Sequence, residues 1–152
     1  MHDHPKDRCS DLREGADLTG ERRGAQRRLL AWLPAVLWAG VIFTLSSIPG
    51  GRLPTIDLPQ SDKVVHALFY GVLAGLTFRA LGRSHGAGTP RFHFLLAILI
   101  ATAYGISDEI HQLWTPQRSA DWRDVVADAG GAIVGAAAMF RFSRRRLSRC
   151  DG

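Results

Sequence analysis

Four apolar segments, each close to the length that crosses a lipid bilayer, dominate this sequence. The first, Leu29 to Ile48, contains no charged residue. A helix needs about 20 apolar residues to cross the hydrocarbon core, and only helices and closed barrels satisfy every backbone group there. Turn-forming or basic residues end each segment, which argues against a soluble helical protein. The pattern predicts an all-α integral membrane bundle of four transmembrane helices at about 29–48, 62–81, 92–114 and 121–140.

The first segment also has a rival interpretation as a cleaved signal peptide. A signal peptide has a shorter apolar core, roughly 7–15 residues, and a small-residue cleavage site. Here the segment is longer and ends before Pro49, so we favour a retained helix. Residues 1–28 are polar and lack the apolar content for a core, which predicts a disordered tail. Residues 141–152 form a basic tail, and 29–140 form the membrane domain.

The basic residues lie unevenly around the four segments. One side carries Arg22, Arg23, Arg27, Arg28, Arg79, Arg83, Arg91, Arg141, Arg144, Arg145, Arg146 and Arg149. The other side carries Arg52, Lys63, Arg118 and Arg123. The positive-inside rule then predicts that both termini are cytoplasmic and that the protein is a multi-pass membrane protein. The net charge of +5 reflects this topology, and we expect no nucleic-acid partner.

The acidic residues show the opposite bias. Between residues 43 and 140, all of them fall on the predicted outer side: Asp57, Asp62, Asp108, Glu109, Asp121, Asp124 and Asp128. Carboxylates contribute little to topology, so their placement needs another reason.

Helical spacing gathers these polar residues onto single faces. The second segment carries a stripe made of Asp62, His66 and Tyr70. The third carries an arc of about 100° made of Asp108, Glu109 and Gln112. The fourth carries a line made of Asp121, Asp124, Asp128, Gly131 and Gly135. Gly131 and Gly135, like Gly71 and Gly75, allow two helices to approach closely. The carboxylates in line with them should therefore face the bundle.

Asp128 lies about 10 Å along its helix from Asp121, taking 1.5 Å per residue. An ionisable group at that depth is expensive unless it faces a cavity or a partner. The available partners are His66, Lys63, Arg118 and Arg123.

Together these residues predict a ligand-binding site, formed by Asp62, Lys63, His66, Tyr70, Asp108, Glu109, Gln112, Arg118, Asp121, Asp124 and Asp128. A competing interpretation is that they are helix caps and interfacial ion pairs, Asp62 and Asp121 above all. No catalytic residue is assigned; the candidates are His66, Asp108 and Glu109, because a histidine beside a carboxylate can act as a general base. His66 and His111 with carboxylates could ligate a metal, but no recognised spacing supports a metal or cofactor assignment.

The spacing of these residues resembles the VanZ-like family. The matching pattern is Asp62-Lys63-x-x-His66-x-x-x-Tyr70, Tyr104-Gly105-x-x-Asp108-Glu109-x-x-Gln112-x-x-x-Pro116-x-Arg118-x-x-Asp121-x-x-Asp124 and Gly131-x-x-x-Gly135. Where the family often has Asn, this chain has Asp128. The resemblance implies a small polytopic protein of the bacterial cell envelope, in a family whose founding member is associated with teicoplanin resistance.

We expect an outer-face polar groove that binds an amphiphile. The partners would be membrane lipids and a lipid-linked cell-wall intermediate or lipoglycopeptide; the oligomeric state is left open. The second hypothesis is a membrane-embedded hydrolase or transferase acting on a phosphate- or acyl-linked lipid through His66 and a carboxylate. A proton-coupled transporter ranks lower, because the inner halves of the helices carry almost no polar residues. A scaffold without a site is the remaining alternative.

Overall fold

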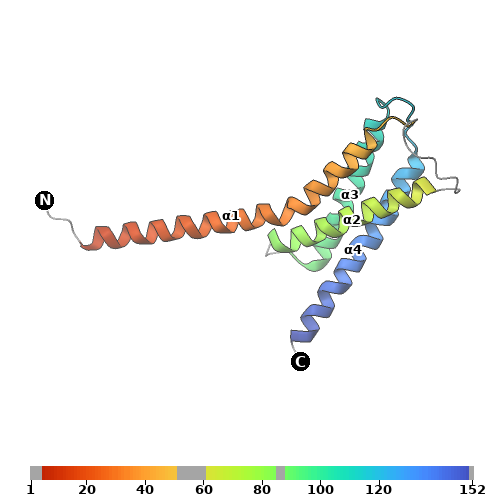
Figure 1. Ribbon diagram of the computed structural model, residues 1–152. Coiled ribbons are helices and arrows are strands. Elements are labelled where there is room, and N and C mark those ends of the chain that lie inside the picture. Colours follow the sequence, from red (N-terminus) through yellow and green to blue (C-terminus); the bar gives the residue numbers. More distant parts are fainter. Residues whose placement is uncertain (1–4, 51–60, 85–87, 151–152) are drawn as a thin grey trace.

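The computed structural model describes residues 5–50, 61–84 and 88–150, with side chains described for 22–50, 62–84 and 88–144. Its helices are α1 (Pro5–Ser46), α2 (Ser61–Ser84), α3 (Pro90–Gln112) and α4 (Trp122–Cys150), with no strand in the described ranges. In Figure 1, α1 and α3 finish at the end of the bundle where α2 and α4 begin. We call this the site end. The predicted all-α bundle of four helices is confirmed.

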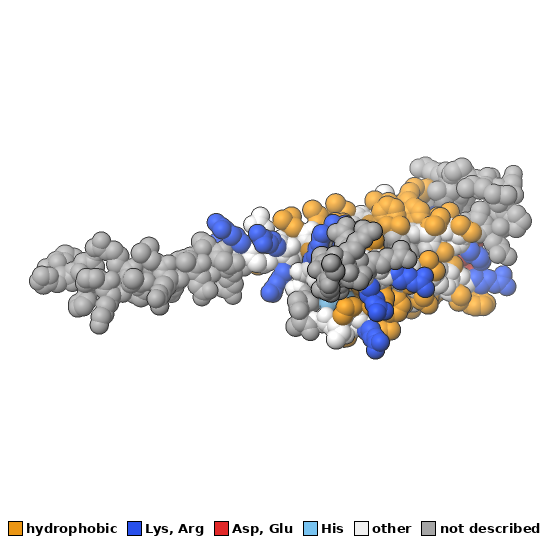
Figure 2. Space-filling model, turned by 90° about the horizontal axis from the view of Figure 1, so that it is seen from below, with side chains coloured by type: hydrophobic (Ala, Val, Ile, Leu, Met, Phe, Trp, Pro, Cys, Tyr) orange, Lys and Arg blue, Asp and Glu red, His pale blue; other side chains and the backbone are white. Residues whose placement is uncertain are grey.

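All four helices are long and apolar enough to cross a membrane, over residues 22–46, 62–84, 90–112 and 122–144. Large apolar side chains cover much of the surface in Figure 2, and Leu99 and Val134 are 64% and 70% exposed. Such exposure is unfavourable in water and expected against lipid tails. The protein is therefore a multi-pass membrane protein.

Two helices extend beyond the predicted boundaries. α1 already begins at Pro5, where the sequence analysis expected a disordered tail, and α4 continues to Cys150 through the basic tail. Extending a helix that already exists avoids the unfavourable nucleation step, and the Arg, Glu, Ala and Leu residues of these ends have high helix propensity. Pro34 lies inside α1, which changes direction partway along its length in Figure 1.

The glycine pairs bring α2 and α4 together, as predicted. A Cβ atom at Gly71 would lie 3.0 Å from the carbonyl oxygen of Gly131. A Cβ at Gly131 would overlap the carbonyl oxygen of Ala67, and one at Gly135 would overlap that of Gly71. The two backbones are thus in direct contact, and α2 and α4 form the most extensive helix pair of the bundle.

Two hydrogen bonds attach α1 to its neighbours. The indole Nε1 of Trp38 donates to the carbonyl oxygen of Phe69 at 2.9 Å, and the two rings stack 5.2 Å apart. The hydroxyl of Tyr104 donates to the carbonyl oxygen of Ala39 at 2.8 Å. These contacts lie beside the buried core formed by Ile42, Tyr70, Leu73, Ala74, Ala101, Ala132 and Ala136.

Candidate functional site

The deepest polar contact joins α2 to α4. His66 Nδ1 lies 3.0 Å from Asp128 Oδ1, and the Asp128 side chain is 1% exposed. Asp128 Oδ2 has no hydrogen-bond partner among the described residues. The predicted need of Asp128 for a partner is confirmed, and of the four candidates the structure selects His66.

Gly105 of α3 makes room for this buried carboxylate. A Cβ atom at Gly105 would lie 2.5 Å from Asp128 Oδ2 and 3.2 Å from Asp128 Cβ. Gly105 is part of the family-like pattern, three residues before Asp108, but it was not among the residues predicted to form the site. Only the packing of the bundle shows that α3 meets Asp128 there.

Lys63 is the cation at the mouth of the site. Its Nζ atom lies 2.8 Å from Asp62 Oδ2, 3.1 Å from Asp124 Oδ1 and 3.5 Å from Asp121 Oδ2. The lysine side chain is 24% exposed, whereas Asp62 is 59% exposed. Lys63 therefore links the start of α2 to the start of α4, and Asp62 is the most accessible member of the group.

Asp121 lies just before α4 and is an N-terminal cap, as one of the alternatives foresaw. Its Oδ1 atom accepts a hydrogen bond from the backbone N–H of Arg123 at 2.9 Å. That bond, with Lys63 nearby, lowers the pKa of the Asp121 carboxyl. Asp121 is consequently ionised throughout the neutral range and down to acidic pH.

The Glu109 carboxylate accepts one hydrogen bond on each of its two oxygens. Its Oε2 accepts from the backbone N–H of Asp121 at 2.8 Å, and its Oε1 accepts from Gln112 Nε2 at 3.4 Å. Gln112 Nε2 also donates to Asp108 Oδ2 at 3.3 Å. All three side chains belong to buried residues of α3. The last turn of α3 therefore forms one side of the site. The Gln112 side-chain amide holds the Asp108 and Glu109 carboxylates in place through its two hydrogen bonds.

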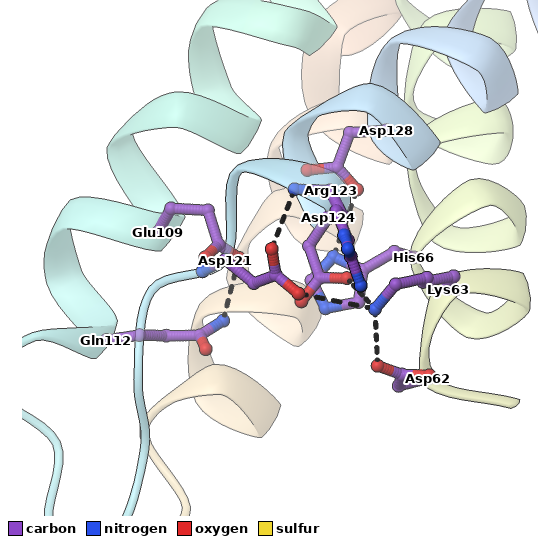
Figure 3. A network of polar contacts seen from close by, with 9 residues as sticks. All are labelled: Asp62, Lys63, His66, Glu109, Gln112, Asp121, Arg123, Asp124 and Asp128. Carbon is purple, nitrogen blue, oxygen red and sulfur yellow. Dashed lines mark hydrogen bonds and ion pairs between the residues drawn. The ribbon is translucent and has the colours of Figure 1, made fainter. Parts of the chain in front are cut away.

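Polar side chains from α2, α3 and α4 converge in Figure 3. Ligand-type atoms of His66, Glu109 and Asp124 all lie within 4.8 Å of one another. Tyr70 stacks on His66 with ring centroids 6.2 Å apart and is 1% exposed, so it forms the floor below the histidine.

Three basic or aromatic residues suggested by the sequence lie elsewhere. Arg118 donates from Nε to the carbonyl oxygen of Ile48 and from Nη2 to that of Leu45, both at 3.4 Å. His111 Nε2 lies 3.1 Å from Ser47 Oγ, and its ring packs on Phe43. The Arg123 guanidinium lies 5.9 Å from the centroid of the Trp122 ring. Neither arginine pairs with Asp128, and His111 does not join His66.

The position of Arg118 leads to a testable prediction. Because its guanidinium binds one carbonyl in the last turn of α1 and one just beyond it, it interacts favourably with the negative end of the helix dipole. We expect Arg118→Ala to lower the free energy of unfolding by ~0.3–1 kcal/mol. Denaturant unfolding in detergent measures this loss, with Arg123→Ala as the control that leaves α1 untouched. A loss of similar size in the control would refute the capping role.

The arrangement combines an imidazole oriented by a buried carboxylate, two further carboxylates within reach, and one ammonium group. Such a set can hold a polar headgroup, accept a proton or ligate a cation. All of these groups lie at the site end of the bundle, where the apolar surface of the helices gives way to polar side chains.

A family model described as VanZ/LLP1 matches residues 25–143 of the chain. The matched region spans all four membrane-crossing segments except the first few residues of α1's span and the last residue of α4's. Neither a curated protein nor a solved structure matches the chain.

Proposed function

The chain belongs to the VanZ/LLP1 family, and from that premise we propose that it is a protein of the bacterial cytoplasmic membrane that binds the polar headgroup of an envelope amphiphile. The observation that supports this most is a set of ionisable residues near the ends of the membrane-crossing segments: the buried Glu109, Asp124 and Asp128, and His66, whose side chain is 15% exposed. Buried charge near a bilayer is expensive and is usually retained for a function.

The ligand class follows from the surroundings of the site. Exposed apolar residues such as Val65, 42% exposed, and Ile110, 49% exposed, lie one position from His66 and Glu109. A ligand bound there meets lipid-facing surface and polar groups together. We propose a lipid-linked cell-wall intermediate or a lipoglycopeptide, whose acyl chains would lie along the helices while the headgroup contacts Lys63 and His66. This ligand class agrees with the glycopeptide-resistance context that the family resemblance implies.

The proposal requires the site end to face outward. The uneven distribution of arginines supports this orientation. In a chain whose Cys9 and Cys150 are replaced by serine, we expect a membrane-impermeant maleimide to label Leu113→Cys in spheroplasts and to leave Arg141→Cys unlabelled. Leu113 is 62% exposed at the site end, and Arg141 is exposed near the opposite end. The reverse labelling pattern would overturn the orientation, and permeabilised cells, where both label, are the control.

Ligand binding is tested by thermal unfolding of the purified chain in detergent with a panel of lipids. A ligand that binds the folded state alone raises its stability by about 2.7 kcal/mol at 100 times its Kd. We expect a lipid-linked phosphate or peptide headgroup to raise the Tm of the wild type and of His111→Ala. The same lipid should not raise the Tm of His66→Ala. His111 is the matched histidine outside the site, hydrogen-bonded to Ser47. Equal shifts in the two variants, or no shift for any lipid, would contradict the proposal.

One contact favours a second candidate function, a membrane-embedded hydrolase or transferase. The pair of His66 Nδ1 and the buried Asp128 carboxylate resembles the orienter–base pair of acyl- and phosphoryl-transfer sites, in which the carboxylate fixes the imidazole. The sequence hypothesis paired His66 with Asp108 or Glu109; the structure gives it Asp128. Turnover of a lipid-linked phosphate or acyl ester by wild type, lost in Asp128→Asn with lipid still bound, would favour this candidate.

A further inference from the structure

We propose that His66, Glu109 and Asp124 bind a Zn²⁺ ion at the site end, with Asp128 orienting the imidazole. One nitrogen and two carboxylate oxygens from three helices lie within 4.8 Å of one another. A histidine with carboxylates is an established donor set for Zn²⁺, and three protein ligands leave a fourth position open.

The geometry around His66 supports the assignment. Its Nδ1 atom is engaged by Asp128 Oδ1 at 3.0 Å, which leaves Nε2 as the nitrogen available to a cation. Histidines that bind metals generally donate their second ring N–H to a carboxylate, which fixes the tautomer and makes the ligating nitrogen more basic. The Asp128 side chain is only 1% exposed. If His66 were only a general base or only half of an ion pair with Asp128, the site would not need Glu109 and Asp124 beside the imidazole.

The charge balance supports a cation as well. The buried residues at this end include the acids Asp108, Glu109, Asp124 and Asp128. Among the described residues, the Lys63 ammonium and the His66 imidazole are the basic groups that contact carboxylates there. Lys63 is shared between Asp62, Asp121 and Asp124. Several buried carboxylates are stable together only when they are protonated, paired or bound to a metal.

The side chains leave ligand atoms available. Lys63 Nζ bonds Asp124 Oδ1, so Asp124 Oδ2 remains for the ion. Glu109 accepts one hydrogen bond on each oxygen, and a carboxylate oxygen has two lone-pair sites. Ligand atoms around a tetrahedral Zn²⁺ are about 3.4 Å apart, given bonds of about 2.0–2.1 Å, so the three groups would close by roughly an ångström on binding.

A bound Zn²⁺ would also explain how a site with so many carboxylates receives an anionic headgroup. The open fourth position would face the ligand, and the ion would replace the repulsion from Glu109 and Asp124 by attraction. In this respect the inference rests on the proposed function, although the presence of the ion itself does not depend on any lipid.

Isothermal titration of the EDTA-stripped full chain in detergent with ZnCl₂ alone, in the absence of lipid, tests the inference. The wild type and His111→Ala should each bind one ion with the same affinity, because His111 lies outside the cluster and contacts Ser47. Asp128→Asn should weaken binding by about 10–100-fold, because it acts on the metal through the imidazole. Glu109→Gln, Asp124→Asn and His66→Ala should weaken it further.

A second measurement, made on the wild type, keeps the test independent of folding defects in the variants. Co²⁺ added to the wild type should give a visible absorption band at one equivalent, which zinc abolishes. A wild type that takes up neither ion at one equivalent, or a His111→Ala variant that loses binding as strongly as Glu109→Gln, overturns the inference. Zinc binding without any lipid-induced stabilisation would refute the proposed function alone, and lipid-induced stabilisation in EDTA without zinc binding would refute the zinc site alone.

Discussion

Replacing Gly131 by alanine is expected to separate α2 from α4 and to destabilise the bundle by ~1–3 kcal/mol. The added Cβ would overlap the carbonyl oxygen of Ala67 and would lie 2.6 Å from both its carbonyl carbon and its Cα. Backbone atoms cannot rotate away as a side chain can, so one helix must move. Gly135→Ala meets the carbonyl oxygen of Gly71 in the same way, and the double variant should be worse than either single one.

The neighbouring Gly130 is the matched control. A Cβ atom at Gly130 meets nothing within 4 Å, on the same helix and one residue away. Alanine is favoured over glycine inside a helix by about 0.8–1.0 kcal/mol, so Gly130→Ala should be neutral or stabilising. Unfolding of the purified variants in mixed micelles measures both effects. Equal stability of Gly131→Ala and Gly130→Ala would show that α2 and α4 do not pack through this glycine face.

Removing His66 is expected to destabilise the bundle more than Gly131→Ala does, for an electrostatic reason. His66→Ala leaves the Asp128 carboxylate, 1% exposed, without its hydrogen-bond partner inside a membrane-spanning helix. Removing one partner of a buried pair typically costs about 3–5 kcal/mol, because the remaining charge is uncompensated. The unfolding free energy in detergent should fall by an amount in that range.

A double-mutant cycle identifies the cause of this loss. Asp128→Asn removes the charge while keeping the shape of the side chain, so His66→Ala/Asp128→Asn should be more stable than His66→Ala alone. The matched cycle with Asp62→Asn, an acid 59% exposed, should show no such rescue. Purely additive losses for His66 and Asp128 would mean that the two side chains do not interact in the folded protein.

Much of the fold could be predicted because the bilayer restricts the solutions so strongly. Four apolar segments of spanning length leave little alternative to a helical bundle, and the spacing of Gly131 and Gly135 correctly indicated the face on which α4 meets a neighbour. The helix ends were less accessible. The apolar pattern predicted that α1 begins and α4 ends where the apolar residues stop. Both helices instead continue through polar residues of adequate helix propensity, because extending an existing helix needs no new nucleation.

The site was predictable in its composition and less so in its pairings. Helical periodicity placed Asp128 on a bundle-facing line and His66 on a stripe with Asp62 and Tyr70, and the cost of a buried acid required a partner for Asp128. Choosing among the four candidate partners of Asp128 requires knowing how α2 is rotated about its axis relative to α4. That rotation depends on packing between segments remote in sequence. The same holds for Gly105, whose missing side chain matters only because α3 lies against Asp128.

Arg118 shows the limit of reasoning from charge alone. Its guanidinium suits a phosphate or carboxylate, and the sequence offers many carboxylates nearby. In the structure it binds the carbonyl oxygens of Leu45 and Ile48 instead. Carbonyl oxygens at a helix end compete for donors as well as side chains do, and the sequence does not show which of them a distant arginine will reach.

Native mass spectrometry of the chain released from its own membranes asks most directly whether the polar cluster binds an amphiphile. The wild type and His111→Ala are expected to carry one lipid-linked envelope molecule per chain, beyond the bulk phospholipids that each variant retains. Glu109→Gln, which alters the carboxylate held by Gln112 and Asp121, is expected to have lost it. The same set of bound lipids on all three proteins, with all three folded, would contradict a binding site at this end of the bundle.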